Sequence, residues 1–254
     1  PETMLISVMF ANNEIGTIQP IEEIGEIAKE HGILFHVDAV QALGSVKIDV
    51  NKQHIDLLSM SAHKIGGPKG IGGMFIRKGT RIDNFVHGGG QERGRRAGTE
   101  GVQNIVGFGK AVEIASQNFE HHVERLTVLR NRLIEGIKKN IPDVVLNGHP
   151  TRRLPNNVNF SYKFVEGESI LLLLDMEGIS ASSGSACTSG SLDPSHVLLA
   201  TGLDHGTAHG SIRFTISEEI TEEDIELTVE TMKKIINKLR AMSPIKNDDE
   251  LHKN

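Results

Sequence analysis

The chain has 254 residues, of which 38% are hydrophobic and 24% charged, and its formal net charge at pH 7 is -6. These values are ordinary for a folded globular protein, while the acidic balance and the lack of tryptophan argue against a general nucleic-acid-binding function. The longest strongly apolar run, residues 170–174, is too short to span a bilayer, and no signal peptide pattern is visible. The single cysteine excludes an internal disulfide and fits a reducing cytoplasm.

The first part of the chain alternates strand-like and helix-like segments. Apolar runs predict strands at residues 4–10, 33–38, 55–61 and 72–76. Apolar residues at helical spacing predict a helix over 20–30, which Gly32 ends. This alternation predicts an α/β layer with a mostly parallel sheet. Because ligands of such sheets bind beyond the carboxyl ends of the strands, Asp38 and Lys64 attract attention at two of these ends.

The second part of the chain is mainly helical, with a long helical pattern over 102–139. Further elements are expected as strands at 143–146, 156–160 and 211–216 and as helices at 168–176 and 221–242. Thr221 and Asp224 resemble a capping pair at the start of the last helix. We expect a domain boundary near residue 115, so that 1–115 belong to a large α/β domain and 116–254 form a smaller α+β domain.

The start of the chain is abrupt, because residues 1–3 lead at once into an apolar strand and there is no initiator methionine. A complete protein rarely begins in this way. We therefore expect the chain to be the C-terminal part of a longer polypeptide, with a processed but complete domain as the alternative.

Two side chains suggest covalent chemistry. Cys187 lies within 182–191, a serine- and glycine-rich stretch typical of a solvated loop, which could carry a nucleophilic sulfur. Lys64 follows a mostly apolar strand, and desolvation lowers the pKa of a lysine towards the neutral form that attacks carbonyls. Asp38 is costly to bury without a partner. The pyridine nitrogen of pyridoxal phosphate would be such a partner, while a helix cap or a buried ion pair is the structural alternative.

Six motifs, taken together and in order, closely resemble the cysteine desulfurases that supply sulfur for iron–sulfur clusters and tRNA thiolation. They are NNEIG (12–16), HVDAVQ (36–41), SAHK (61–64), HGGGQER (87–93), SSGSAC (182–187) and GSIRF (210–214). The resemblance runs from Met4 to about residue 240. It implies a fold type I enzyme that depends on pyridoxal phosphate, with 1–115 as part of the cofactor-binding domain.

The resemblance assigns the following cofactor contacts. Lys64 would hold the cofactor aldehyde as a Schiff base, and Asp38 would keep the pyridine nitrogen protonated. Ser61 and His63 would bind the phosphate, with His63 also counted among the catalytic residues. Gln41 would bond the phenolic oxygen of the cofactor.

Three further positions complete the site that the resemblance implies. Asn13 would bond the same phenolic oxygen and lie near the substrate. Thr99, in RAGT (96–99), would reach the phosphate of the partner subunit in a homodimer. Arg213 would hold the carboxylate of L-cysteine, which a planar guanidinium suits better than an ammonium group does.

The reaction implied is the conversion of L-cysteine to L-alanine, with the sulfur left on Cys187 as a persulfide. The acceptor of that sulfur would be an iron–sulfur scaffold or a tRNA-thiolating protein, in the cytoplasm and without direct contact to nucleic acid or membrane. No histidine spacing suggests a metal site.

Relatives carry a preceding segment with a phosphate cradle and a histidine that stacks on the cofactor. We therefore expect the isolated chain to bind pyridoxal phosphate poorly and to be inactive. Two alternatives remain. One is a selenocysteine lyase or related lyase, which the thiol-bearing loop disfavours. The other is a non-catalytic protein that binds a partner.

Overall fold

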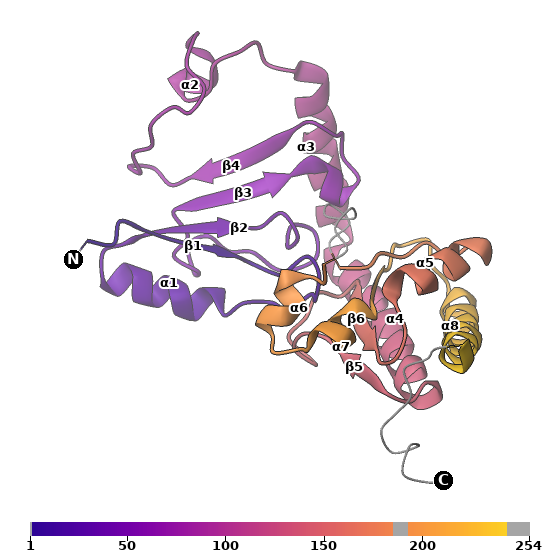
Figure 1. Cartoon of the computed structure of the whole chain (residues 1–254). Coiled ribbons are helices and arrows are strands. Elements are labelled where there is room, and N and C mark those ends of the chain that lie inside the picture. Colours follow the sequence, from indigo (N-terminus) through magenta and orange to yellow (C-terminus); the bar gives the residue numbers. More distant parts are fainter. Residues whose placement is uncertain (1, 185–192, 243–254) are drawn as a thin grey trace. The chain divides into compact units, whose positions relative to one another are not determined.

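In a computed structural model of the chain, residues 2–184 and 193–242 are described (Figure 1). The chain divides into two units. Unit 1 comprises Pro1–Ala11 and Gln19–Phe119, and unit 2 comprises Asn12–Ile18 and Glu120–Asn254. The division into two domains, 1–115 and 116–254, that the sequence suggests remains a prediction. Within the described residues, no helix combines the length and the apolar character needed to cross a membrane.

Unit 1 is built on a four-stranded sheet in the order β1-β2-β3-β4 (Figure 1). Its strands are β1 (Leu5–Met9), β2 (Leu34–Asp38), β3 (Leu57–Ser61) and β4 (Gly72–Ile76). The first three strands are parallel, and β4 pairs antiparallel with β3. The expected mostly parallel sheet is confirmed. Because β1, β2 and β3 run in the same direction, Met9, Asp38 and Ser61 end at the same edge.

The helices of unit 1 are α1 (Ile21–Glu30), the single 3₁₀ turn η1 (Ala62–Ile65), α2 (Gln91–Gly94) and α3 (Val102–Gln117). Helix α1 buries Ile21 and Ala28 and ends just before Gly32, as its apolar spacing predicts. The helical pattern expected over 102–139 forms two helices rather than one. Helix α3 ends at Gln117, Asn118 leaves the helical conformation, and α4 (Phe119–Asn140) begins in the next residue.

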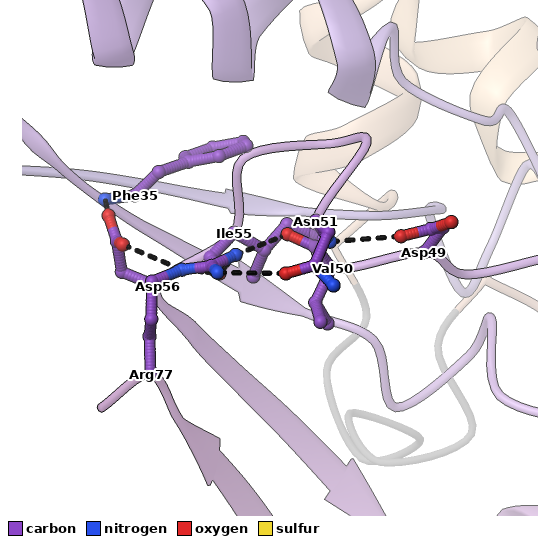
Figure 2. A network of polar contacts seen from close by, with 7 residues as sticks. All are labelled: Phe35, Asp49, Val50, Asn51, Ile55, Asp56 and Arg77. Atoms are coloured by element: carbon purple, nitrogen blue, oxygen red, sulfur yellow. Dashed lines mark hydrogen bonds and ion pairs between the residues drawn. The ribbon is translucent and has the colours of Figure 1, made fainter.

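Arg77, the residue after β4, lies at the end of the sheet opposite to Asp38 (Figure 2). Its Nε lies 3.2 Å from Oδ1 of Asp56, and Oδ2 of Asp56 accepts a hydrogen bond from the backbone N–H of Phe35 at 3.0 Å. The Arg77 guanidinium also donates to the carbonyls of Ile55 at 2.7 Å and Val50 at 2.5 Å. One side chain therefore joins β4, the start of β3 and the loop before it.

Unit 2 contains a three-stranded antiparallel sheet in the order β5-β6-β7. Its strands are β5 (Val144–Leu146), β6 (Asn157–Tyr162) and β7 (Ser211–Thr215). Its helices are α4, α5 (Gly167–Met176), α6 (His196–Ala200), α7 (His205–His209) and α8 (Glu222–Met242). The antiparallel sheet with accompanying helices agrees with the α+β character expected for this part of the chain.

All six residues of β6 are buried, and the strand separates two environments. Val158, Phe160 and Tyr162 join an apolar core with residues of α4, α5, β7 and α8. Since alternate strand residues point to opposite faces, the other three residues face away from that core. Those three are Asn157, Asn159 and Ser161.

The last helix begins as its sequence predicts. Oγ1 of Thr221 accepts a hydrogen bond from the Asp224 N–H at 3.2 Å, and Oδ2 of Asp224 accepts one from the Thr221 N–H at 2.9 Å. This reciprocal pair satisfies two backbone donors at the start of α8. The backbone and hydroxyl hydrogen bonds from Thr221 lower the pKa of the Asp224 carboxyl.

Candidate functional site

Asp38 ends β2 with one carboxylate oxygen engaged and the other available. Oδ1 accepts a hydrogen bond from the Val40 N–H at 2.9 Å, which closes a turn directly after the strand. No described residue bonds Oδ2. The side chain is half-buried, and its strand neighbours Phe35 and Val37 are fully buried on the opposite face. Asp38 is thus neither a helix cap nor a member of a buried ion pair within the described residues.

A chain of hydrogen bonds crosses the same face of the sheet. Nδ1 of His36 lies 2.7 Å from Oγ of Ser7, and its Nε2 lies 2.8 Å from Oγ of Ser59. His36 shares its face with Asp38, because the two are separated by one residue in β2. The three parallel strands therefore carry polar side chains beside the acid. The sequence analysis did not single out this arrangement, although alternation of polar and apolar residues in β2 indicates it.

Ser61, His63 and Lys64 lie together at the end of β3. Oγ of Ser61 lies 2.7 Å from Nδ1 of His63, and His63 and Lys64 occupy the 3₁₀ turn η1. The turn ends at Gly66 with a φ of 76°, a conformation that glycine adopts without strain. A hydroxyl, an imidazole and an amine therefore lie at the carboxyl end of β3. The adjacent strand β2 ends with Asp38 at the same edge of the sheet.

Lys64 is exposed, so the described residues do not supply the desolvation that the sequence analysis expected around its amine. Gln41 is half-buried in the turn after β2, with no hydrogen bond to its side chain from a described residue. Thr99 is exposed between α2 and α3, and no described contact joins it to the residues at the sheet edge. Its assignment to a neighbouring subunit stays a prediction.

Asn13 and Arg213 meet in unit 2. The Arg213 guanidinium donates from one terminal nitrogen to the Asn13 carbonyl at 2.9 Å. The backbone of Arg213 also exchanges two hydrogen bonds with Ser182, of 3.0 and 2.6 Å, so that Ser182 extends the sheet beside β7. The two residues assigned to the substrate therefore lie in contact, although 200 positions separate them.

The segment that carries Asn13 is a tight loop. Oδ1 of Asn12 accepts hydrogen bonds from the N–H groups of Glu14 and Ile15, at 2.8 and 3.0 Å. Gly16 follows with a φ of +73°, and a Cβ there would lie 2.7 Å from Oδ1 of Asn157. Glycine is required at this position for both reasons. The motif NNEIG thus has a structural explanation as a loop that is seated on β6.

Buried asparagines of β6 hold this loop by hydrogen bonds to its backbone. Nδ2 of Asn159 donates to the Glu14 carbonyl at 3.0 Å, and Nδ2 of Asn157 donates to the same oxygen at 3.2 Å. Asn147 completes the arrangement by donating to Oδ1 of Asn159 at 2.7 Å. The sequence analysis missed these residues. The signal was present as polar residues at alternate positions of a strand that is otherwise apolar.

A buried arginine fixes the far side of the loop. Arg153 is 3% exposed and donates to the carbonyls of Ile15 at 3.2 Å and Asn157 at 3.3 Å. Burial, to which the charge of Arg130 adds, lowers the pKa of Arg153 to about 10. The guanidinium is held by carbonyl groups rather than by an acid, so it orders the backbone of the loop.

The expected site residues are thus found in both units. Asp38, Gln41, Ser61, His63, Lys64 and Thr99 belong to unit 1, and Asn13 and Arg213 belong to unit 2. Cys187 lies outside the described residues. Across residues 2–184 and 193–242, no group of three or more histidine, cysteine, aspartate or glutamate side chains could hold a metal ion.

Comparison with known protein families supports the same reading of these motifs. The sequence profile of the family described as aminotransferase class-V matches residues 1–228. The chain belongs to this family. The match includes every residue that the sequence analysis assigned to the site, from Asn13 to Arg213.

Similar curated proteins carry the name cysteine desulfurase IscS. The relative from Clostridium botulinum is 60% identical over 249 residues, which cover 97% of this chain and 63% of the relative. The relative from Methanosarcina thermophila is 59% identical over 244 residues, which cover 96% of this chain and 60% of the relative. The resemblance to cysteine desulfurases is confirmed. The chain spans less than two thirds of the length of these relatives.

Solved structures give the same family likeness. A NifS-like protein aligns with a TM-score of 0.84 at 37% identity, covering 93% of this chain and 62% of that protein. A NifS-like protein from Rickettsia africae aligns with a TM-score of 0.85 at 33% identity, covering 92% of this chain and 62% of the Rickettsia chain. The expected fold class, an α/β fold type I architecture represented in part, is confirmed.

Proposed function

We propose that this chain is part of a pyridoxal phosphate-dependent cysteine desulfurase, which converts L-cysteine to L-alanine and leaves the sulfur on Cys187 as a persulfide. The observation that carries the proposal is the position of Asp38 and Lys64 at the carboxyl ends of two adjacent parallel strands. Family membership and the names of the similar proteins support it. An acid with an open oxygen and an exposed amine at such an edge suit a ligand that needs both.

The donor set at this edge fits pyridoxal phosphate. Oδ2 of Asp38 can accept a hydrogen bond from a protonated pyridine nitrogen, since no described residue bonds it. Ser61 and His63, which lie in contact at 2.7 Å, offer a hydroxyl and an imidazole to the phosphate. Gln41 offers its side-chain amide to the phenolic oxygen, and the family resemblance assigns Asn13 of unit 2 to the same oxygen. When bound, pyridoxal phosphate supplies an electron sink for bonds at the substrate Cα.

Lys64 has two tasks in this proposal. Its amine would hold the cofactor aldehyde covalently. As a free amine it would remove or return a proton at Cα of the substrate. The exposed position on a one-turn helix after β3 leaves the side chain free to perform both tasks.

Arg213 would bind the carboxylate of L-cysteine. One terminal nitrogen already donates to the Asn13 carbonyl, which fixes the plane of the guanidinium. A guanidinium held in one plane offers a fork of parallel donors that matches a carboxylate. Binding the carboxylate orients the Cα–H bond of the substrate and excludes amines that lack an acid group.

Cys187 would accept the sulfur. Its thiolate attacks Sγ of L-cysteine, an S–S bond forms, and the bond between Cβ and Sγ breaks. The carbon fragment takes up protons and leaves as L-alanine, so one L-cysteine and one enzyme thiol give one L-alanine and one enzyme persulfide. The persulfide is a reversible state of cysteine from which an acceptor can take the outer sulfur.

The proposal includes the partners that such a reaction needs. A homodimer would let Thr99 approach the phosphate bound by a second copy, and a cytoplasmic iron–sulfur scaffold or tRNA-thiolating protein would take the sulfur. The exposed position of Thr99 supports a role at a subunit contact. Cross-linking of the purified enzyme, followed by size measurement, tests the dimer.

The decisive experiment assays the intact enzyme that contains this chain with L-cysteine. We expect L-alanine to form in a one-to-one ratio with a persulfide on the Cys187 peptide, as detected by mass spectrometry. Cys187→Ala should abolish the persulfide and leave cofactor bound at Lys64, whereas Lys64→Ala should abolish both. Equal sulfur release by the wild type and by Cys187→Ala would refute the role of the thiol.

A further inference from the structure

Glu14 is a buried acid for which the proposed reaction has no use. The residue is 2% exposed and lies in the loop over 12–18, next to Asn13. Its Oε2 accepts a hydrogen bond from Oγ of Ser195 at 2.5 Å, and no other described residue donates to the carboxyl group. Burying a carboxyl group with a single partner costs free energy. Its presence therefore calls for a role in holding Ser195.

Gly184, which directly precedes residues 185–192, and Ser195, which follows them after two further residues, both lie near this acid. A Cβ built on Gly184 would lie 3.4 Å from Cβ of Ser195 and 3.8 Å from Oε2 of Glu14. We call Gly184 and Ser195 together the neck, because Gly184 precedes and Ser195 follows the segment that contains Cys187. Glu14 therefore contacts Ser195 directly and has Gly184 close to the same carboxyl oxygen.

The return side of the neck is also the start of helix α6. Oγ of Ser195 accepts hydrogen bonds from the N–H groups of Val197 and Leu198 while it donates to Glu14. The single hydroxyl thus links the acid to the first turn of the helix. Because a hydroxyl has one donor and two acceptor sites, the arrangement uses its hydrogen-bonding capacity in full.

The backbone around Glu14 is hydrogen-bonded to residues near the proposed substrate-binding pair, Asn13 and Arg213. The Glu14 carbonyl accepts from Asn159 at 3.0 Å, and the preceding carbonyl, that of Asn13, accepts from Arg213 at 2.9 Å. On the departing side of the neck, Ser182 exchanges its two backbone hydrogen bonds with Arg213. Every contact lies within unit 2.

We infer that Glu14 is a positioning residue that holds the neck of the Cys187 segment against the Asn13–Arg213 pair. The inference rests on the proposed function, which gives Cys187 and Arg213 their roles. What the position requires is an acceptor for Oγ of Ser195. A fixed neck gives the thiol constant attachment points relative to the carboxylate of the substrate, so fewer conformations must be searched before the sulfur is attacked.

Two substitutions at Glu14 distinguish its role as a hydrogen-bond acceptor from its role in filling space. In the intact enzyme, Glu14→Gln keeps an oxygen that can accept from Ser195, and Glu14→Met fills the space without an acceptor. The readout is the single-turnover rate of persulfide formation on Cys187, followed by mass spectrometry. We expect Glu14→Met to slow this rate roughly tenfold or more and Glu14→Gln to remain within about threefold of the wild type.

Removing the donor tests the same contact from its other side. Ser195→Ala should slow persulfide formation about as much as Glu14→Met, and the double variant should be no slower than the slower single variant, because both changes remove one interaction. Hydrogen exchange of the peptides over 12–18 and 195–200 should accelerate in Glu14→Met and not in Glu14→Gln. Cofactor covalently bound at Lys64 should be unchanged in all variants.

Glu222→Gln is the matched control, because it also converts an acid of unit 2 to its amide but alters an exposed pair with Arg132. Its rate should equal that of the wild type. A Glu14→Met rate within about twofold of the wild type would overturn the inference, as would Glu14→Gln being as slow as Glu14→Met. If Glu14→Met does not fold, a wild-type rate for Ser195→Ala overturns it. Failure of the proposed function is distinct, because Cys187→Ala would then retain sulfur release.

Discussion

The Arg213 guanidinium donates to the Asn13 carbonyl at 2.9 Å, across 200 positions of sequence. Asn13 belongs to a loop that Asn12 closes from within and that buried asparagines of β6 hold from below. The orientation of the guanidinium is therefore set before any substrate binds. Preorganisation of this kind lowers the entropic cost of binding a small anion.

Arg213→Lys should weaken the use of L-cysteine while leaving the fold intact. The ammonium group keeps the positive charge but loses the planar fork and the hydrogen bond that orients it. In the intact enzyme we expect kcat/KM for L-cysteine to fall about 10- to 100-fold, mostly through KM. Steady-state assays of L-alanine formation measure the change, and cofactor content should stay at the wild-type level.

Arg240→Lys provides the control for Arg213→Lys. Arg240 also lies in unit 2, and its guanidinium also donates to backbone carbonyls, those of Lys163, Pro142 and Asp143. It has no proposed contact with substrate. Its kcat/KM should remain within about twofold of the wild type. A comparable loss in both variants would mean that general stability, rather than carboxylate binding, explains the effect of Arg213→Lys.

Arg77→Met should destabilise unit 1 without touching the candidate site. The guanidinium bridges Asp56 and the carbonyls of Ile55 and Val50, so the substitution removes the donor from partly buried acceptors (Figure 2). We expect a loss of about 2 kcal/mol in the free energy of unfolding. Urea denaturation followed by circular dichroism measures it.

A matched substitution keeps this interpretation open to refutation. Lys110→Met also removes a cation of unit 1, but its pair with Glu113 is exposed, with side chains 60% and 53% accessible. Its effect should be below about 0.5 kcal/mol. Equal losses for Arg77→Met and Lys110→Met would show that the contacts of Arg77 do not stabilise the sheet edge.

The elements of the fold could be predicted from the sequence where one physical signal dominated. Alternation of apolar strands and an amphipathic helix predicted the mostly parallel sheet, and Thr221 with Asp224 predicted the start of α8. The break at Asn118 could not be predicted, because the apolar spacing continues across it. The assignment of residues 12–18 to unit 2 depends on contacts with β6, which local sequence does not encode.

The candidate site was predictable to a different degree at each position. Asp38 ends one apolar strand and Lys64 follows another. Because ligands of such sheets bind beyond the carboxyl ends of the strands, the sequence was enough to single out both residues. Glu14, Asn159 and Ser195 were missed, because their partners lie 145 and 181 positions away and no spacing rule joins them. The desolvation expected for Lys64 is not provided by the described residues, since burial depends on what packs around a strand end rather than on the strand itself.

The 254-residue chain by itself should bind pyridoxal phosphate weakly. Lys64 is exposed, and the described donors for the phosphate at the edge of β3 are Ser61 and His63. A charged ligand held by few donors competes poorly with water. Borohydride reduction of the chain with the cofactor, followed by mass analysis of the Lys64 peptide, should give labelling well below one cofactor per chain.

Surface lysines also react with an aldehyde, so the measurement needs a reference. Lys69 lies in the glycine-rich loop after Lys64 and is exposed. We expect Lys64→Ala and Lys69→Ala chains to lose similar small amounts of label. One labelled Lys64 per chain, with a strong absorption band that borohydride removes, would contradict weak binding.

Tyr162→Phe should stabilise unit 2 slightly. Tyr162 is fully buried in β6, and no described residue bonds its hydroxyl. Removing a buried hydroxyl without a partner relieves a desolvation cost while the ring keeps its packing. We expect a gain of about 1 kcal/mol in urea denaturation. Tyr162→Leu, which removes the ring as well, should instead cost about 2 kcal/mol or more.

Alkaline titration of the same residue gives a direct optical test of the core. Burial raises the pKa of the Tyr162 phenol well above its usual value of 10.0, because the low-polarity surroundings disfavour the phenolate. The folded chain therefore binds more protons than the unfolded chain above pH 10, and the free energy of unfolding must fall as the pH rises through that range.

Tyr162 is the single tyrosine of the chain, and tryptophan is absent, so tyrosinate absorbance reports this one group. The folded chain should show no ionisation near pH 10 and should ionise only together with the loss of helical circular dichroism at higher pH. In urea, the same absorbance should titrate near the usual value. A reversible ionisation near pH 10 with circular dichroism unchanged would show that water reaches the phenol and that β6 does not seal the core of unit 2.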